Sequence, residues 1–277
     1  MTNRRAACLI GWPAGHSRSP IIHKYWMKSF GIDGDYRIEA VNPEDLADFL
    51  ARLGEHGYIG ANLTIPHKER ALALTDADAR ARAVGAANTL WLDGSTLRAT
   101  NTDVEGFLDN LDASSPGWDR ATREALVLGA GGAARAVVFG LIERGVPTIH
   151  LVNRNLPRAE ELARDFGAAV RPATWDRIAS LLPRATLLVN TTSLGMKDQP
   201  PLDVDVTLLP PSATVADAVY VPLDTDLLKA ARARGLNTAD GLGMLLHQAV
   251  RGFSLWFGKR PVVTADLRVL VEADLRA

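Results

Sequence analysis

Apolar and polar residues follow two periods along this chain, and together the periods predict strands that alternate with helices. In the first hundred residues, the apolar runs 6–11, 35–41 and 60–65 are short and partly alternating, which is typical of strands. Helices are predicted after the first two runs, because apolar residues recur there every three or four positions. One opens at the N-cap candidate Ser19 and the other covers 43–57.

Two turn signals and a break follow in the sequence. Pro66 comes directly after the third strand and suits the first position of a helix, so we expect a helix there. Asp93-Gly94 lies between NTLWL and STLRA and predicts a hairpin with a type I′ turn. The segment 112–120 (DASSPGWDR) collects Ser, Pro and Gly and loses periodicity, so we place an interdomain connection near it.

The second half of the chain restarts the alternation with apolar runs that are short and continuous. Such runs are expected when both faces of a parallel sheet are covered. Strands are predicted at 124–130, 148–153, 168–170, 186–192 and 214–220, with helices at 132–144, 157–166, 176–182 and 225–234. This order predicts a doubly wound nucleotide-binding domain of the α/β class. Two amphipathic helices, 241–258 and 264–275, end the chain, and they either cover an edge of this second sheet or return to the first domain.

The composition narrows the function without identifying it. Of 277 residues, 31 are Lys or Arg and 32 are Asp or Glu, so the net charge of -1 gives no general attraction to nucleic acid or anionic lipid. The single cysteine, Cys8, lies in an apolar run and has no partner for a disulfide or a thiolate metal site. No segment reaches the roughly 18 apolar residues of a membrane span, and none resembles a signal peptide. We expect a cytoplasmic protein that binds neither nucleic acid nor membranes.

The clearest motif follows the strand at 124–130. Residues 129–134 (GAGGAA) fit the pattern G-x-G-x-x-A and stand between an apolar strand and a helix. In this setting the glycines permit a tight turn and a close backbone approach to a pyrophosphate, which the helix N-terminus attracts. A glycine-rich turn without a ligand is the less favoured interpretation.

The turn after the next strand distinguishes the two nicotinamide dinucleotides. NAD requires an acidic residue there to bind the ribose 2′-hydroxyl. This chain instead has Asn153, Arg154 and Asn155, with Arg158 further along. Two guanidinium groups and two amides suit a 2′-phosphate, because Arg pairs bidentately with phosphate oxygens. The sequence therefore predicts NADP.

Polar residues gather at the predicted loops of the first domain. Ser17 and Ser19, two positions apart beside a helix start, make an uncharged anion site fit for a carboxylate, but helix capping explains them equally well. The other candidates carry amide, hydroxyl, amine and acid groups: Asn62, Thr64, Lys68, Asn88 and Asp103. Lys68 by itself is either an ordinary solvated charge or a group that faces a cleft. The whole set fits a small polyhydroxylated acid, and the histidine spacing predicts no metal site.

Taken together, the motifs resemble the shikimate dehydrogenase family. GWPAGHSRSP, GANLTIPHK, GAANTL, TNTD, GAGGAARA, NRN, NTTSLGM, DAVY and GLGMLLHQA occur in the order of that family and span essentially the whole chain. The resemblance implies reversible NADPH-dependent reduction of 3-dehydroshikimate to shikimate, in aromatic amino acid (chorismate) biosynthesis. It also implies an N-terminal α/β substrate domain (1–105 with 241–277) and a Rossmann-like NADP-binding domain (106–240), with the final helices packed on the first domain. We expect a monomer or homodimer.

The resemblance also assigns roles to individual residues. Lys68 and Asp103 would form the catalytic pair, and no metal is implied. The implied substrate-binding residues are Ser17, Ser19, Asn62, Thr64, Lys68, Asn88, Asp103, Tyr220 and Gln248. The implied cofactor-binding residues are Gly129, Ala130, Gly131, Gly132, Ala133, Asn153, Arg154, Asn155, Arg158, Thr191, Ala218, Gly241 and Met244. The departures from the family pattern, at Ala14, Asn155 and Ala218, leave the catalytic pair intact.

Three alternatives stand beside this interpretation. A quinate/shikimate dehydrogenase of the same superfamily would use NAD and predicts an acidic residue after the second Rossmann strand, where NRNLPR has none. An aminoshikimate dehydrogenase would look similar. A non-catalytic NADP- or shikimate-binding regulator predicts a damaged catalytic pair, whereas both Lys68 and Asp103 are present.

Overall fold

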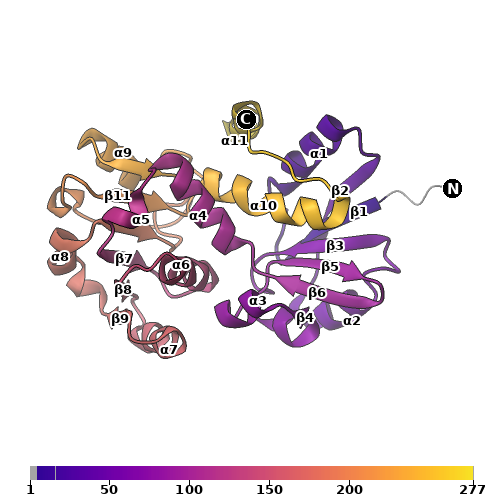
Figure 1. Cartoon of the computed structure of the whole chain (residues 1–277), viewed down its shortest axis with the longest axis horizontal. Helices are drawn as coiled ribbons and strands as arrows, with labels where there is room; N and C mark the ends of the chain where they lie inside the picture. The colour runs from indigo at the N-terminus through magenta and orange to yellow at the C-terminus, as the bar shows by residue number, and fades with distance from the viewer. Residues whose placement is uncertain (1–4, 16, 277) are drawn as a thin grey trace. The chain divides into compact units, whose positions relative to one another are not determined.

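The computed structural model describes residues 5–15 and 17–276 and divides the chain into two units (Figure 1). The first unit runs up to Asp103 and resumes at Gln248, and the second covers Val104–His247. Within the described residues, no helix has the length and apolar character needed to cross a membrane.

The first unit is built on a mixed six-stranded sheet in the order β2-β1-β3-β5-β6-β4. Its strands are β1 (Arg5–Gly11), β2 (Gly34–Ala40), β3 (Tyr58–Leu63), β4 (Asp76–Ala77), β5 (Thr89–Asp93) and β6 (Thr96–Thr100). Strand β1 is parallel to β2 and β3, whereas β5 is antiparallel to β3 and β6. The helices that precede Asp103 are α1 (Ser19–Phe30), α2 (Leu46–Ala51) and α3 (Ala79–Val84). The three strands predicted first are confirmed, and the helix predicted over 43–57 is shorter, with a 3₁₀ turn at Pro43–Asp45.

The helix predicted from Pro66 does not form. The Ile65–Pro66 peptide bond is cis, and the chain turns so that the His67 N–H donates to the Thr64 carbonyl at 2.9 Å. The next helical segment is a short 3₁₀ helix at Arg70–Leu74. Proline suits a tight turn as well as a helix start, so the sequence alone did not separate the two. Lys68 therefore lies on a turn.

Strands β5 and β6 form the predicted hairpin, but the turn type differs from the prediction. Asp93 pairs with Thr96, so the two loop residues are Gly94 and Ser95. Gly94 has a φ of 61°, and Asp198 is the only non-glycine residue with positive φ in the described part of the chain. A type I′ turn needs positive φ at both loop positions, whereas positive φ at the first alone is type II′.

The second unit is built on a parallel six-stranded sheet in the order β12-β11-β10-β7-β8-β9. Its strands are β7 (Glu124–Leu128), β8 (Thr148–Val152), β9 (Val170–Ala173), β10 (Leu187–Asn190), β11 (Thr214–Asp217) and β12 (Asn237–Ala239). Its helices are α4 (Asp103–Ser114, whose first residue belongs to the first unit), α5 (Trp118–Ala121), α6 (Gly132–Glu143), α7 (Leu156–Phe166), α8 (Ile178–Leu181) and α9 (Asp226–Ala233). Counted from β7, the strand order is that of a doubly wound Rossmann sheet, so the predicted α/β fold class is confirmed.

The segment 112–120 lies inside the second unit, so the interdomain connection predicted there is wrong. Arg144 pairs with Asp119 at 3.1 Å and also with Asp112, which accepts a hydrogen bond from Trp118 Nε1 at 2.9 Å. Trp118 is buried. The polar residues that suggested a linker therefore hold a tryptophan and an arginine in place.

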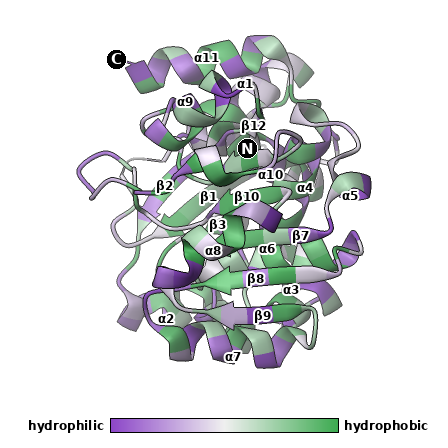
Figure 2. Cartoon of the chain, turned by 90° about the vertical axis from the view of Figure 1, so that its left-hand side faces the viewer, coloured by the Kyte–Doolittle hydropathy of each residue, from purple (hydrophilic) through white to green (hydrophobic). Residues whose placement is uncertain are grey.

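Burial explains why the apolar runs form strands. In the second sheet, Leu126, Leu188 and Val215 on adjacent strands are fully buried in one core cluster. Cys8 and Leu63 belong to the core of the first unit, and burial raises the pKa of the Cys8 thiol. Figure 2 shows β1 and β8 mainly in the hydrophobic colour, whereas α7 and α11 carry both colours.

The last two helices, α10 (Gly241–Phe257) and α11 (Ala265–Arg276), pack on the first unit from Gln248 onward. Trp256 Nε1 donates to the carbonyl of Leu90 on β5 at 2.8 Å. Arg18, before α1, pairs with Asp274 on α11 at 2.5 Å. Of the two placements left open by the sequence, these contacts agree with a return to the first domain.

The packing of Trp256 predicts that a side chain at Gly60 destabilises the first unit. A Cβ at Gly60 would lie 2.1 Å from Trp256 Nε1 and 2.4 Å from the Leu90 carbonyl oxygen. We expect Gly60→Ala to cost about 1–3 kcal/mol and to lower the midpoint of thermal unfolding by several degrees, measured by circular dichroism. Gly54→Ala is the matched control, because its Cβ would be 3.3 Å from a flexible Leu92 methyl group. Equal midpoints for the two variants would contradict this account of the packing.

Candidate active site

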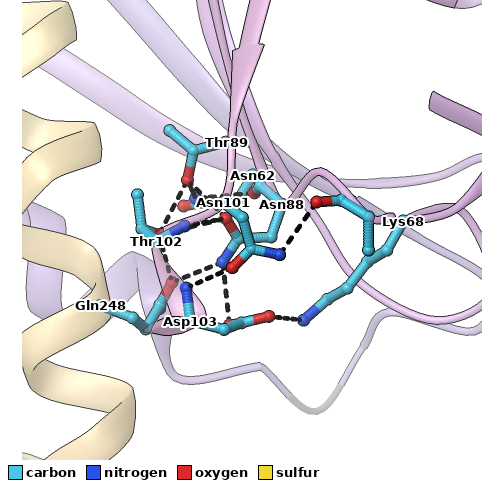
Figure 3. A network of polar contacts seen from close by, with 9 residues as sticks. Asn62, Lys68, Asn88, Thr89, Asn101, Thr102, Asp103 and Gln248 are labelled. Carbon is cyan, nitrogen blue, oxygen red and sulfur yellow. Dashed lines mark hydrogen bonds and ion pairs between the residues drawn. The ribbon is translucent and has the colours of Figure 1, made fainter. Parts of the chain in front are cut away.

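Lys68 and Asp103 form an ion pair in the first unit (Figure 3). Lys68 lies on the turn after β3, and Asp103 is the first residue of α4. The Lys68 Nζ is 2.5 Å from Asp103 Oδ2, and the two side chains are 22% and 9% exposed. Lys68 is therefore held by a carboxylate in a half-buried place, and it does not extend freely into solvent.

Asn88 fixes the other oxygen of Asp103. Its Nδ2 donates to Asp103 Oδ1 at 2.8 Å, while its Oδ1 accepts from the Thr102 backbone N–H at 2.7 Å. A backbone N–H only donates, so the amide oxygen of Asn88 must face it and the NH₂ group must face Asp103. The Asp103 backbone N–H also donates to Asn101 Oδ1 at 3.0 Å. Both the backbone and the carboxylate of Asp103 are therefore oriented by protein groups.

Gln248, from α10, joins the same network. Its Oε1 lies 3.4 Å from both Asn88 Nδ2 and Thr102 Oγ1. Figure 3 shows Gln248 reaching from its helix toward Asn88 and Thr102. The structure therefore brings four of the predicted site residues together: Lys68, Asn88, Asp103 and Gln248.

Asn62 is close to this group but is buried behind it. Only 3% of the residue is exposed, its Oδ1 accepts from the Tyr36 hydroxyl, and its Nδ2 donates to the Asn88 carbonyl and Thr89 Oγ1. Thr64, two positions on, is half-buried at the start of the turn. The hydrogen bonds of Asn62 indicate that it supports Asn88, so a direct contact with substrate remains only a prediction.

Neither Ser17 nor Ser19 is the N-cap residue of the first helix. Helix α1 begins at Ser19 itself, and its N-cap residue, Arg18, makes no capping hydrogen bond through its side chain. The Ser19 N–H donates to Ser17 Oγ at 3.2 Å, and the two hydroxyl oxygens lie 3.1 Å apart. The sequence explained the two serines equally well as an anion site or as helix caps. Their paired hydroxyls agree with the anion-site interpretation.

His67 is excluded as a general base by its burial. The residue is 1% exposed, and its Nε2 lies 2.9 Å from the Val41 carbonyl oxygen. Burial lowers the pKa of the imidazole. Within residues 5–15 and 17–276, no three His, Cys, Asp or Glu side chains are grouped to hold a metal ion.

The glycine-rich loop of the second unit follows β7 and opens α6. Gly129 has a φ of 105°, which favours glycine, and a Cβ there would lie 2.6 Å from Thr191 Oγ1. Gly131 is the N-cap of α6, and a Cβ on it would meet no protein atom within 4 Å. The loop lies at the switch point between β7 and β10, where the order of the sheet reverses. Its exposed backbone and the helix N-terminus fit a pyrophosphate group.

The turn after β8 carries the residues predicted to bind a 2′-phosphate. Arg154, Asn155 and Arg158 are exposed, and Asn153 is half-buried with its Nδ2 donating to the Asn155 carbonyl at 2.9 Å. Neither arginine pairs with a carboxylate in the described part of the chain. Two unpaired cations beside the loop fit an additional phosphate.

The other predicted cofactor-binding residues, Thr191, Ala218, Gly241 and Met244, also belong to the second unit. Ala218 and Met244 line one small cavity, and a Cβ on Gly241 would lie 2.4 Å from the Ala218 carbonyl oxygen. Thr191 Oγ1 donates to the Leu128 carbonyl at 2.6 Å. Tyr220, predicted to bind substrate, is half-buried in the second unit, and its role stays a prediction.

Asn101, Thr102 and Thr89 were missed by sequence reasoning. Each is at most 1% exposed, and each hydrogen-bonds within the Asn88 network or beside Asp103. The signals in the sequence were the motifs TNTD, which contains Asn101 and Thr102, and GAANTL, which contains Thr89; they gave only Asp103 and Asn88 as candidates.

Three family models match the chain. "Shikimate dehydrogenase substrate binding domain" matches residues 9–90, "Shikimate / quinate 5-dehydrogenase" matches 113–196, and "Shikimate 5'-dehydrogenase C-terminal domain" matches 241–270. The "Shikimate dehydrogenase (NADP(+))" of Nitrobacter hamburgensis is 70% identical over 275 residues, which cover 99% of this chain and 96% of the relative. The chain belongs to the shikimate dehydrogenase family. The family predicted from the motifs is thus confirmed.

Solved structures of the shikimate dehydrogenase family agree with the fold. The shikimate 5-dehydrogenase of Thermus thermophilus, in complex with NADP(H) and shikimate, is 36% identical with a TM-score of 0.85, over 99% of this chain and 98% of the other. The quinate dehydrogenase of Corynebacterium glutamicum, in complex with NAD, is 31% identical with a TM-score of 0.90, over 98% and 99% of the chains. The family therefore contains relatives with different substrates and cofactors.

Gly131 offers a test of the pyrophosphate loop that does not disturb folding. Because a Cβ there meets no protein atom, Gly131→Ala should change the unfolding midpoint by no more than a few degrees. The methyl group would stand where the pyrophosphate must approach, so we expect NADPH to bind about tenfold more weakly or worse. The measurement is a fluorescence titration with NADPH, with Gly54→Ala as a control that keeps wild-type affinity. Unchanged affinity in Gly131→Ala would argue against this loop as the binding site.

Proposed function

We propose that this chain is an NADP-dependent shikimate dehydrogenase, which reversibly reduces 3-dehydroshikimate to shikimate. The observation that carries the proposal is the Lys68–Asp103 pair, with Nζ 2.5 Å from Oδ2 and the other carboxylate oxygen held by Asn88. A non-catalytic binding protein would not require both members of this pair to be kept. Relatives that are 70% identical carry the same name, which supports the proposal.

The chemistry of the pair follows from where charge develops. Bound NADPH would supply a hydride to the ketone carbon, leaving negative charge on the former carbonyl oxygen. A proton donor beside that oxygen lowers the barrier, and Lys68 is the proposed donor. In the direction of oxidation, Lys68 would take the proton of the substrate hydroxyl. Asp103 would orient the amine, and Asn88 keeps Asp103 from rotating away.

The remaining ligand contacts are proposed from the same network. Ser17 and Ser19 would bind the carboxylate through their adjacent hydroxyls, while Thr64, Asn88, Tyr220 and Gln248 would bind ring substituents. The first unit would then hold the substrate and the second the cofactor, close to the predicted division into 1–105 with 241–277 and 106–240. A cytoplasmic location is part of the same proposal.

The proposed NADP preference rests on the turn after β8. Arg154 and Arg158 are exposed cations, and the adjoining positions carry amides where an NAD enzyme needs a carboxylate. The relatives from Nitrobacter hamburgensis and Rhodopseudomonas palustris are named for NADP(+), which agrees with this preference.

The proposal is tested by measuring absorbance at 340 nm while shikimate and quinate are each combined with NADP and NAD. We expect the largest kcat/KM for shikimate with NADP, because of the two arginines and the absence of an acidic residue in the turn. A preference for quinate with NAD would overturn both the substrate and the cofactor assignments.

Lys68→Ala tests the catalytic assignment. We expect kcat to fall by about 10²–10⁴-fold, because the proton donor is lost, while KM for shikimate changes much less. Lys24→Ala is the matched control, since Lys24 is an exposed lysine that pairs with Asp35 at 3.4 Å. Near-normal turnover in Lys68→Ala would rule out its role in proton transfer.

A further inference from the structure

A line of buried polar side chains leads from Tyr36 to Gln248, and the mechanism above does not use it. It starts at Tyr36, which is 1% exposed and donates from its hydroxyl to Asn62 Oδ1 at 2.7 Å. Burial raises the pKa of Tyr36, so the phenol keeps its proton and remains a donor. The neighbouring Ser19 side chain lowers the pKa of Tyr36, but by less than burial raises it. Tyr36 thus lies between Ser19 and Asn62.

The orientation of the Asn62 amide is forced by its neighbours. Its Nδ2 lies 3.2 Å from the Asn88 carbonyl oxygen, which only accepts, and 3.0 Å from Thr89 Oγ1. The amide oxygen must therefore face Tyr36, and the amide hydrogens must point toward Asn88 and Thr89. Asn62 receives one hydrogen bond from Tyr36 and passes one to Thr89.

Thr89 and Thr102 continue the line of hydrogen bonds, and each donates its hydroxyl proton in the direction that leads away from Tyr36. Thr89 Oγ1 already accepts from Asn62, and the shortest contact for its own proton is Thr102 Oγ1 at 3.0 Å. Thr102 Oγ1 then has its proton for Gln248 Oε1 at 3.4 Å or Asn88 Oδ1 at 3.2 Å. Asn88 Oδ1 already takes the Thr102 backbone N–H at 2.7 Å. Either acceptor leaves each hydroxyl with one hydrogen bond accepted and one donated; we assign the proton to Gln248 Oε1 because Asn88 Oδ1 already accepts the Thr102 backbone N–H.

We propose that Tyr36, Asn62, Thr89 and Thr102 form a one-way hydrogen-bond relay that orients Gln248, so that Tyr36 is a positioning residue for substrate binding. The relay acts together with Asn88 Nδ2, which also faces Gln248 Oε1 at 3.4 Å, to turn the oxygen of Gln248 toward the protein, so that its amide nitrogen would bind a ligand hydroxyl. Chains of hydrogen bonds polarise one another, so breaking the first link weakens the last. The inference rests on the proposed function, because it takes shikimate as the ligand of Gln248.

Tyr36 permits a clean substitution. Its ring stacks on His23 with centroids 4.2 Å apart and contacts Trp256 at 5.9 Å, so Tyr36→Phe removes one oxygen and keeps the ring packing. His23 is fully buried, and burial lowers its pKa to about 3, so it stays neutral beside the ring. Tyr25→Phe is the matched control, because the Tyr25 hydroxyl is exposed and, within residues 5–15 and 17–276, hydrogen-bonds only to Thr264, at 3.4 Å.

The experiment compares wild type, Tyr36→Phe, Thr89→Val, the double variant, Thr89→Ser and Tyr25→Phe, each with its unfolding midpoint. We expect Tyr36→Phe and Thr89→Val each to raise KM for shikimate about three- to tenfold, with kcat nearly unchanged. The double variant should raise KM no further than the larger single effect, because one break already disconnects the relay. Thr89→Ser keeps the hydroxyl and should restore wild-type KM, and Tyr25→Phe should match wild type.

The outcomes separate this proposal from the proposed function. A wild type that does not oxidise shikimate overturns the proposed function and removes the ligand on which the relay depends. An active wild type with unchanged KM in Tyr36→Phe, or with effects that multiply in the double variant, overturns the relay alone. If Tyr36→Phe does not fold, Thr89→Val and Thr89→Ser decide. A KM that is raised in Thr89→Val but not in Thr89→Ser supports the relay, whereas equal KM values in the two variants overturn it.

Discussion

The hydrogen bond from the Thr102 backbone to Asn88 Oδ1, at 2.7 Å, is the contact on which the arrangement of the proposed catalytic pair depends. A backbone N–H cannot accept, so reversing the Asn88 amide would place donor against donor at a cost of about 1–3 kcal/mol. The fixed amide holds one oxygen of Asp103, and the other oxygen holds Lys68. The backbone N–H of Thr102 therefore fixes the position of the Lys68 amine through the side chains of Asn88 and Asp103. No charge has to be buried alone to achieve this.

In both units, the proposed site residues lie on turns that follow strands of the central sheet. In the second unit, Gly129 follows β7 and Thr191 follows β10, on either side of the point where the strand order reverses. Thr191 also bonds the Leu128 carbonyl, which ties the two turns together at 2.6 Å. In the first unit, Lys68 follows β3 and Asp103 follows β6. Rigid strands thus fix the origin of each functional loop, and the loops carry the variable groups.

The sequence predicted what depends on local periodicity and on glycine. The strand runs, the glycine-rich loop and the doubly wound order follow from burial on both faces of a parallel sheet. The sequence-based prediction failed where the local structure depends on a contact with a residue far away in the chain. The segment 112–120 resembles a linker in sequence, but Arg144 binds its aspartates within the second unit. Strand β12, at Asn237–Ala239, is too short to give a periodic signal. The orientation of Asn88 likewise depends on a neighbour in space, which no pattern along the chain reveals.

The packing of Trp256 on β5, beside Gly60, also affects how the protein folds during its synthesis. The first unit is discontinuous, because it needs residues from Gln248 onward, whereas the second unit is one uninterrupted segment. On the ribosome, the N-terminal sheet emerges first but must wait for nearly the entire chain before its last helices can cover it. The second unit has all its residues earlier, so it can complete its core while the first still exposes apolar surface. The order of synthesis is therefore the reverse of the order in which the two units can be finished.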